Sequence, residues 1–210
     1  MKVISVISQK GGAGKTTLTR HLAVEFSKDY EKVAITDTDP QGTLANFYNR
    51  RVKFVPDNKL GYVTMDIKNV NATFDALEKR GVDLLIIDTP PTLIDFYNEI
   101  LPHTDLVLVP TKDSLEDLET LGNTIRAIKP FEKPMSFVLV GGKKNSNLHK
   151  EAAEFLESNK LELLGTFPQS EAVKQSAGKG LNVVEFKRYT TPSFELRKVY
   201  DRVKHKLESN

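Results

Sequence analysis

One glycine-rich segment limits what this chain can fold into more than any other, namely Ser8–Thr17 with the sequence SQKGGAGKTT. It follows an apolar run at Val3–Ile7 and precedes a helical spacing of Leu18, Leu22 and Phe26. Glycines let a backbone adopt positive φ and approach an anion closely, while the N–H groups at the start of the next helix point at that anion. The order of strand, loop and helix therefore predicts a cradle for the phosphates of a nucleotide.

Residue types within this loop predict separate roles. Lys15 is expected to reach the β and γ phosphates, and the Thr16 hydroxyl is expected to ligate Mg²⁺. The loop departs from the pattern G-x-x-x-x-G-K-[ST], because Gln9 occupies the position of the first glycine and Lys10 precedes the glycine pair. Since a second cation beside Lys15 would be repelled, Lys10 is expected to act on phosphate bound in another subunit. The remaining nucleotide contacts are expected from Gly11, Gly12, Ala13, Gly14 and Thr17.

Short apolar runs recur along the chain between segments with helical spacing. The runs at 84–87 and 106–109 do not alternate with polar residues, which is typical of strands covered on both faces. The alternation predicts an α/β fold with a mostly parallel, doubly wound sheet and helices on both faces, in a single domain over residues 1–210. Val52–Gly61 is the expected irregular connection. The predicted strands are Val3–Ile7, Val33–Thr36, Tyr62–Met65, Leu84–Ile87, Leu106–Val109, Phe137–Val140 and Leu163–Phe167.

Acidic residues follow two of the predicted strands. Asp37 and Asp39 lie in the segment DTDPQG, and Asp88 ends the apolar run LLIID. Because the carboxyl ends of parallel strands meet at one edge of a sheet, we expect these carboxylates beside the phosphate loop. An aspartate that ends an apolar strand beside a phosphate loop can hold the water shell of a nucleotide-bound magnesium, so Thr16 and Asp88 are expected at the metal.

Composition narrows the class of protein. The chain has no cysteine, which excludes disulfide frameworks, thiolate zinc sites, cysteine nucleophiles and iron–sulfur clusters held by its own thiolates. No run reaches the roughly 18 to 20 apolar residues needed to cross a bilayer, and the N-terminus lacks the pattern of a secretory signal. We therefore expect a cytoplasmic protein. The first predicted strand starts so early that no separate helix-turn-helix module is expected before it.

Three segments together resemble the ParA/MinD family of deviant Walker A ATPases, and in particular small ParA-type DNA partition ATPases. They are KGGAGKTT with its leading Lys10, DTDPQG, and LLIIDTPP, and the segments at 107–121 and 167–186 are also similar. The resemblance implies that Lys10 crosses the interface of a homodimer, formed around sandwiched ATP, to the partner's phosphates. It also implies that Asp39 positions the attacking water and that Asp37 lies near the magnesium shell, as the third residue of the metal site with Thr16 and Asp88. Asp88 would be the Walker B aspartate, and Lys10, Lys15 and Asp39 would be the catalytic residues.

The resemblance further implies the cofactors and partners. ATP and Mg²⁺ would drive dimerisation, and slow hydrolysis stimulated by a ParB-type centromere-binding protein would reverse it. In relatives the loop near Pro168 contributes to the base pocket. The segment Gly141–Ser146, GGKKNS, lacks the N-K-x-D element common in guanine-specific folds, which favours ATP over GTP.

The C-terminal part of the chain is basic. Residues 174–210 contain nine Lys or Arg and four Asp or Glu, so this part carries +5 and leaves −3 for residues 1–173. A helix is expected to start at Thr190–Ser193, and its apolar stripe is better suited to packing against the domain than to a MinD-type membrane tail. The stripe consists of Leu196, Val199, Tyr200, Val203 and Leu207. The candidate contacts to double-stranded DNA, bound without base specificity, are Lys174, Lys179, Arg197, Lys198 and Arg202. A solvated helix face is the alternative interpretation.

Three functions are compatible with these features. The first is an ATP-driven dimer switch for plasmid or chromosome partition, associated with nucleoid DNA when ATP is bound. The second is a MinD-like membrane-associated ATPase that positions or recruits another protein. The third is a metabolic ligase of the dethiobiotin synthetase type, against which Lys10 and the DPQ segment argue.

Overall fold

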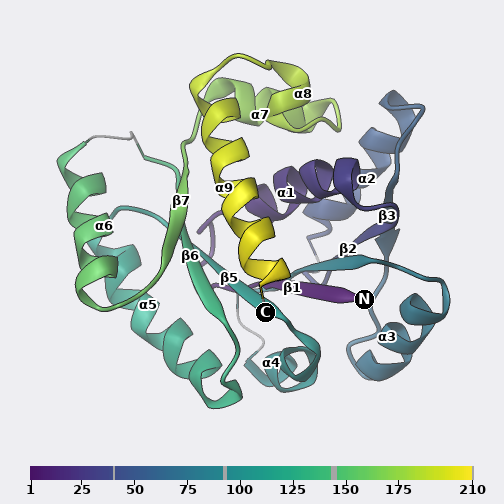
Figure 1. The fold of residues 1–210 in the computed structure, drawn as a ribbon, viewed down its shortest axis with the longest axis horizontal. Helices are drawn as coiled ribbons and strands as arrows, with labels where there is room; N and C mark the ends of the chain where they lie inside the picture. The colour runs from purple at the N-terminus through teal and green to yellow at the C-terminus, as the bar shows by residue number, and fades with distance from the viewer. Residues whose placement is uncertain (40, 92–93, 143–145, 210) are drawn as a thin grey trace.

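The computed structural model describes residues 1–39, 41–91, 94–142 and 146–209, excluding the side chains of residues 94 and 95. Within these residues, seven parallel strands form one sheet in the order β3-β2-β4-β1-β5-β6-β7 (Figure 1). Pro40 of DTDPQG and residues 143–145 of GGKKNS lie outside the described residues. The strands are β1 Lys2–Val6, β2 Val33–Asp37, β3 Leu60–Val63, β4 Leu84–Asp88, β5 Leu106–Thr111, β6 Met135–Val140 and β7 Leu163–Phe167.

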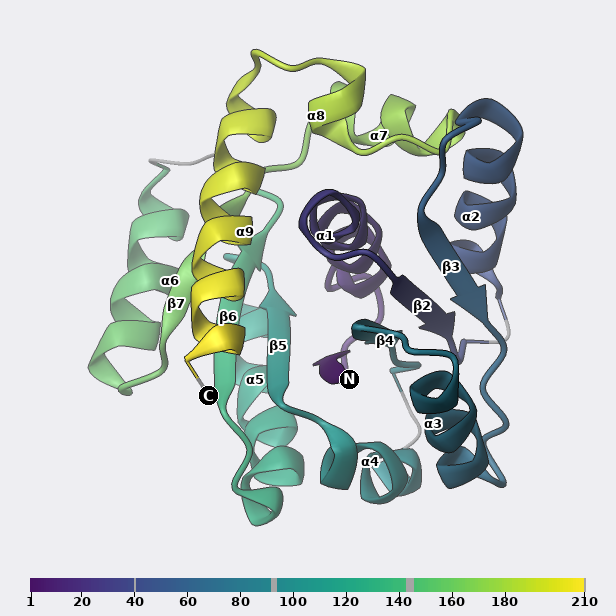
Figure 2. The same cartoon turned by 45° about the vertical axis from the view of Figure 1, so that its right-hand side comes forward.

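Helices cover both faces of the sheet, as Figure 2 shows with α1 and α9 on the side opposite α4 and α5. One layer contains α1 Lys15–Asp29, α2 Thr43–Phe54, α7 Glu171–Gly178, α8 Val183–Phe186 and α9 Thr191–Glu208. The other layer contains α3 Val70–Lys79, α4 Ile94–Ile100, α5 Leu115–Ile128 and α6 Asn147–Ser158. Short 3₁₀ turns at Leu101–His103 and Lys129–Phe131 follow α4 and α5. These findings confirm the predicted doubly wound α/β architecture.

The strands lack polar alternation because both of their faces are buried. Ile4 and Val6 of β1 point into one hydrophobic core, whereas Val3 points into the other. Since successive side chains of a strand point to opposite faces, a strand between two helix layers needs apolar residues at every position. Leu84–Ile87 of β4 meets this requirement, and all four side chains are fully buried.

The register of the sheet places the functional strand ends side by side. Asp88 at the end of β4 pairs with Val6 of β1 on one side and with Asp37 of β2 on the other. The chain therefore leaves β1, β2 and β4 at one level, and the loops that follow these strands meet there.

Two local predictions need correction. The third strand is Leu60–Val63 rather than Tyr62–Met65, since it pairs with Val33–Thr36 of β2. The Asn58 side chain accepts a hydrogen bond from the Leu60 N–H and fixes this start. The expected irregular stretch at 52–61 is shorter, because α2 continues to Phe54 and the strand begins at Leu60.

The C-terminal helix confirms the predicted packing. Its apolar stripe is buried against α1 and β7 in the same core as the first strand. In the part of the chain that the structure describes, no helix combines the length and the apolar character that a membrane span requires.

Candidate nucleotide site

The phosphate loop leads from β1 directly into α1. Gly12 and Gly14 have φ angles of 73° and 100°, and Gly14 is the residue immediately before the helix. A Cβ atom on Gly14 would lie 2.5 Å from Cγ1 of Val140, so both the backbone conformation and the close approach of β6 require glycine here. The predicted order of strand, loop and helix is confirmed.

Lys15 lies at the mouth of this loop. Its buried side chain donates hydrogen bonds from Nζ to the carbonyl oxygens of Ser8, at 3.0 Å, and Lys10, at 3.3 Å. Burial lowers the pKa of Lys15, while the carboxylates of Asp88 and Asp39 oppose that shift. The carbonyl oxygens of Ser8 and Lys10 therefore hold the ammonium against the phosphate loop, where it would attract a bound anion strongly.

Thr16 and Asp88 form the candidate magnesium site. The Thr16 hydroxyl donates to Oδ2 of Asp88 at 2.6 Å, whereas Oδ1 of the same carboxylate is buried without a hydrogen-bond partner in the described residues. Burial raises the pKa of Asp88 to about 7, although the Thr16 hydrogen bond acts in the opposite direction. A buried carboxylate with an unsatisfied oxygen beside a hydroxyl suits a divalent cation, because Mg²⁺ takes oxygen ligands and few protein groups. The described residues contain no group of three or more His, Asp or Glu side chains that could hold a metal ion.

The other two predicted acids adjoin this pair. Asp37 accepts the N–H of Asp39 on one oxygen and the N–H of Leu44 on the other, both at 2.9 Å. Asp39 accepts the N–H of Gln41 on Oδ1 at 2.9 Å, and its Oδ2 has no hydrogen-bond partner within the described residues. Asp37 thus holds the loop between β2 and α2 in place, whereas Asp39 keeps one carboxylate oxygen available at the site.

Lys10 points away from this group. Its Nζ lies 2.9 Å from Oδ2 of Asp117, a buried residue in the first turn of α5. The Ser114 hydroxyl also donates to that carboxylate. The two lysines of this short segment therefore have different partners. Lys15 donates to carbonyl oxygens of its own loop, whereas Lys10 pairs with a carboxylate on α5.

A cavity of about 140 Å³ opens beside Gly12, Gly14 and Thr17. Pro168 belongs to its wall, as do three cationic residues, Arg20, Lys112 and Lys174. Burial, together with the nearby Arg50, lowers the pKa of Arg20 to about 10, which leaves the side chain charged at neutral pH. Sequence reasoning missed Arg20 and Lys112, although the position of Lys112 directly after β5 is the same strand-end signal that identified Asp88.

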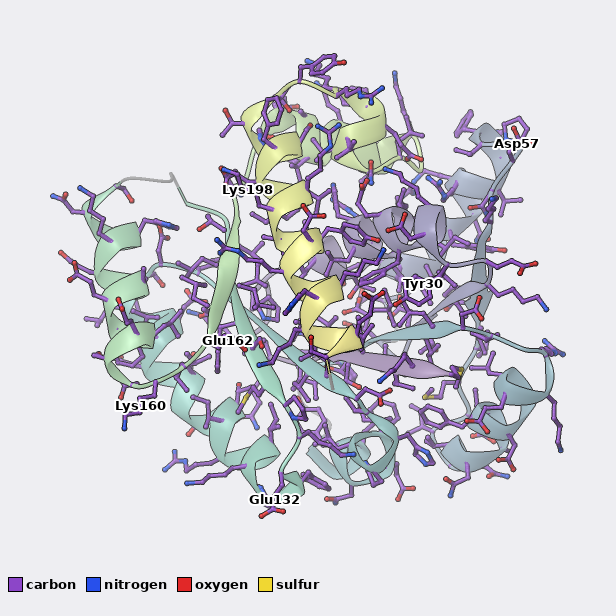
Figure 3. All side chains as sticks on the ribbon, viewed as in Figure 1. Tyr30, Asp57, Glu132, Lys160, Glu162 and Lys198 are labelled. Carbon is purple, nitrogen blue, oxygen red and sulfur yellow. The ribbon has the colours of Figure 1, made fainter. Side chains whose placement is uncertain are left out.

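The predicted DNA contacts have different partners within the described residues. Lys174 lines the nucleotide cavity, and Arg202 donates from its guanidinium to the Leu164 carbonyl of β7 at 2.9 Å. Lys198 lies on α9 (Figure 3), where its ammonium is 3.2 Å from the Glu195 carboxylate one turn away. Lys179 and Arg197 each lie over an aromatic ring instead, that of Phe186 and that of Phe194.

The fold and the site define a phosphate-loop nucleotide-binding protein. Residues 4–183 match the family described as the CobQ/CobB/MinD/ParA nucleotide binding domain, and the chain belongs to that family. This match confirms the ParA/MinD-type class of nucleotide-binding protein that the sequence motifs indicated.

Relatives within the family have different cellular roles. The chain is 30% identical to a maintenance of carboxysome distribution protein A of Gloeobacter kilaueensis, over 61% of this chain and 58% of that protein. It is 25% identical to Protein IncC of Escherichia coli over 99% of this chain and 70% of that protein. The chain thus spans less than three fifths of the length of the first of these curated relatives. The MinC:MinD cell division protein complex of Aquifex aeolicus has the same fold, with a TM-score of 0.80 at 18% identity over 98% of this chain and 96% of that one.

Proposed function

We propose that this protein is an ATP-dependent dimerisation switch that hydrolyses ATP slowly and binds DNA without sequence specificity. The observation that carries this proposal is the divergence of the two lysines, because Lys15 faces its own phosphate loop while Lys10 reaches the surface of α5. The Lys10 side chain is about one-third exposed, so it is accessible to a second copy of the chain. A nucleotide sandwiched between two copies would use both cations, one from each subunit.

Bound Mg²⁺–ATP would supply the γ-phosphoryl group that water attacks, and the Mg²⁺ ion would neutralise part of the negative charge on the phosphates. Thr16 and Asp88 would hold the metal or its water shell, with Asp37 adjacent to them. Lys15, together with the partner's Lys10, would stabilise negative charge on the phosphates. Asp39 would orient the attacking water through its Oδ2 atom, for which the described residues provide no other partner.

A partition role is one version of this function. A relative described as the chromosome-partitioning ATPase Soj, from Thermus thermophilus, is 25% identical to this chain over 60% of it and 61% of that protein. In this role the ATP-bound dimer would associate with nucleoid DNA, and a ParB-type centromere-binding partner would stimulate hydrolysis. Contacts to DNA phosphates would be weak in one subunit and would gain avidity on dimerisation.

A MinD-like membrane role is less well supported, because the apolar stripe of α9 is already buried. Leu196, Val199, Val203 and Leu207 have no exposed surface. A helix whose apolar face packs on its own domain has no such face left for a bilayer.

Light scattering tests the proposal directly. The molar mass should double with ATP and Mg²⁺ and should remain that of a monomer with ADP. Lys10→Ala should bind ATP in calorimetry but stay monomeric, whereas Lys15→Ala should not bind ATP. A Lys10→Ala protein that dimerises like the wild type would refute the role of Lys10 across the interface.

A further inference from the structure

Three aromatic rings at the junction of α7, α8 and α9 each lie under cations. Nζ atoms of Lys179 and Lys187 are 5.1 and 5.8 Å from the Phe186 ring centroid. The guanidinium of Arg188 is 5.8 Å from the Tyr189 ring, and that of Arg197 is 5.8 Å from the Phe194 ring. We call this surface the aromatic–basic ridge, and it consists of Lys179, Phe186, Lys187, Arg188, Tyr189, Phe194 and Arg197.

Two rings of the ridge are open to solvent. Tyr189 is 77% exposed and Phe194 is 47% exposed. Large apolar side chains with this exposure contribute little to the core, and neither residue belongs to a hydrophobic cluster among the described residues. Their rings are therefore available for contacts with a ligand.

The cations of the ridge carry charge that no carboxylate of the described residues neutralises. Lys179, Lys187, Arg188 and Arg197 have no carboxylate partner among the described residues. The two acids of the same segment have their own basic partners, since Glu185 pairs with Arg51 at 2.9 Å and Glu195 pairs with Lys198. The ridge is thus a positively charged surface with aromatic rings between its charges.

The ridge is built on a well-supported platform. The buried Arg51 of α2 binds Glu185 through both terminal nitrogens and donates to the Gly180 carbonyl at 3.0 Å. Asn182 caps α8 with a reciprocal Asn182–Glu185 pair, and its amide donates to Glu25 of α1. These contacts fix the start of α8, and the Ser193 hydroxyl donates to the Lys187 carbonyl just after its end. The segment that carries the rings therefore has a defined backbone.

We infer that the aromatic–basic ridge binds single-stranded nucleic acid. Exposed rings can stack on bases, and base faces are accessible in a single strand but not in a duplex. The cations close to the rings can contact the phosphates that alternate with bases along the strand. This inference goes beyond the proposed function, because contact with a duplex backbone requires cations but not aromatic rings.

Fluorescence anisotropy with labelled oligo(dT), oligo(rU) and a random-sequence duplex, each about 20 nucleotides long, tests the inference. Tyr189→Ala should weaken binding of the single strands by about tenfold, since one base stack is worth roughly 1–3 kcal/mol, and should leave duplex binding nearly unchanged. Tyr189→Phe should bind like the wild type because the ring remains. The two oligonucleotides show whether the affinity differs between a DNA strand and an RNA strand.

Matched controls separate the ridge from the rest of the surface. Phe155→Ala removes a 39% exposed ring from α6, which lies on the other face of the sheet, and should change nothing. The double variant Lys187→Gln/Arg188→Gln should weaken all three probes and should reduce the salt slope for single strands by about 1.4. Lys150→Gln on α6 should leave that slope unaltered.

Two results would overturn the inference. One is equal affinity for single strand and duplex with no effect of Tyr189→Ala, which would leave only a backbone contact. The other is pelleting with phosphatidylglycerol vesicles that Tyr189→Ala abolishes while oligonucleotide binding persists, which would assign the rings to a lipid surface. Lys10→Ala separates this inference from the proposed function, because the monomer should still bind oligo(dT) in a Tyr189-dependent manner.

Discussion

The Lys10 ammonium lies 2.9 Å from the Asp117 carboxylate and ties the phosphate loop to the first turn of α5. The carboxylate is nearly buried, whereas the lysine is about one-third exposed. The lysine proposed to contact a second subunit is thus bound within its own chain in this structure. Its transfer to another partner requires this ion pair to open.

Asp117→Asn should therefore favour the ATP-bound dimer. The asparagine can still accept a hydrogen bond from Ser114 but no longer attracts Lys10 electrostatically. Partly exposed ion pairs are worth about 1 kcal/mol or less, and a dimer opens two of them. We therefore expect the apparent dimer dissociation constant to fall by up to about fivefold per subunit, or about 30-fold in total. Analytical ultracentrifugation over a range of ATP concentrations measures this shift. Glu119→Gln, which removes an exposed charge from the same helix, is the matched control, and an equal shift in that variant would contradict the prediction.

Asp88→Asn should reduce the dependence of ATP binding on Mg²⁺. The amide offers a weaker ligand than the carboxylate, so we expect the affinity with Mg²⁺ to fall about tenfold or more while the affinity in EDTA changes little. Calorimetry with and without chelator gives both values. Thr16→Ser should retain the hydroxyl and bind like the wild type, whereas Thr16→Val should resemble Asp88→Asn. Undiminished Mg²⁺ dependence in both defective variants would place the metal elsewhere.

Arg202→Ala should affect stability rather than DNA binding. Its guanidinium donates to the Leu164 carbonyl on β7, which is one of the two edge strands of the sheet within the described residues. Loss of this hydrogen bond should reduce the free energy of unfolding by about 1 kcal/mol, as measured by urea denaturation. Lys198→Ala, in an exposed ion pair on the same helix, should change it by less than about 0.5 kcal/mol. A large loss of duplex affinity in Arg202→Ala would instead show that Arg202 contacts DNA.

His21 should make the fold less stable in mild acid. The ring is fully buried, its Nδ1 lies 2.8 Å from the Thr17 carbonyl, and burial, assisted by Arg20, lowers its pKa from 6.5 to about 3. As the pH falls below 6.5, the unfolded chain binds a proton that the folded protein excludes until about pH 3. The free energy of unfolding should therefore fall by up to about 1.4 kcal/mol per pH unit within this window.

His21→Asn tests this assignment because its amide can still donate to the Thr17 carbonyl. The variant should be less stable at neutral pH. Its free energy of unfolding should depend less steeply on pH, by the contribution of about one proton. Urea unfolding between about pH 4 and pH 7 supplies the comparison. Parallel pH profiles for the two proteins would show that another group is responsible.

Sequence alone predicted the strands well because burial on both faces leaves a direct signature. Leu84–Ile87 and Leu106–Val109 are apolar at every position, and few structures other than a central parallel strand require this. The edge strand β3 was misplaced by two residues, because Tyr62 and Val63 are only half-buried and the signal is weaker there. Its start depends on the Asn58 side chain, a tertiary contact that apolar periodicity does not reveal.

The candidate site was predictable where it lies close to a strand end. Asp37 and Asp88 end β2 and β4, and Asp39 lies in the loop after β2. Lys15 and Thr16 begin α1, directly after the loop that follows β1. The Lys10–Asp117 pair was not predictable, because an acid in the first turn of a helix has an ordinary capping role and the two residues are far apart in sequence. Lys174 and Arg202 were grouped by charge alone, but the fold directs one to the cavity and the other to a strand carbonyl.

The Lys15 ammonium donates to the carbonyl oxygen of Lys10, at 3.3 Å. This hydrogen bond joins Lys15, which would contact the bound phosphates, to the backbone of Lys10, which would contact a second copy of the chain. An anion that draws Lys15 away from this carbonyl would also release the peptide that carries Lys10. Nucleotide binding and dimerisation would then be coupled directly through this one hydrogen bond, without a conformational change in the core.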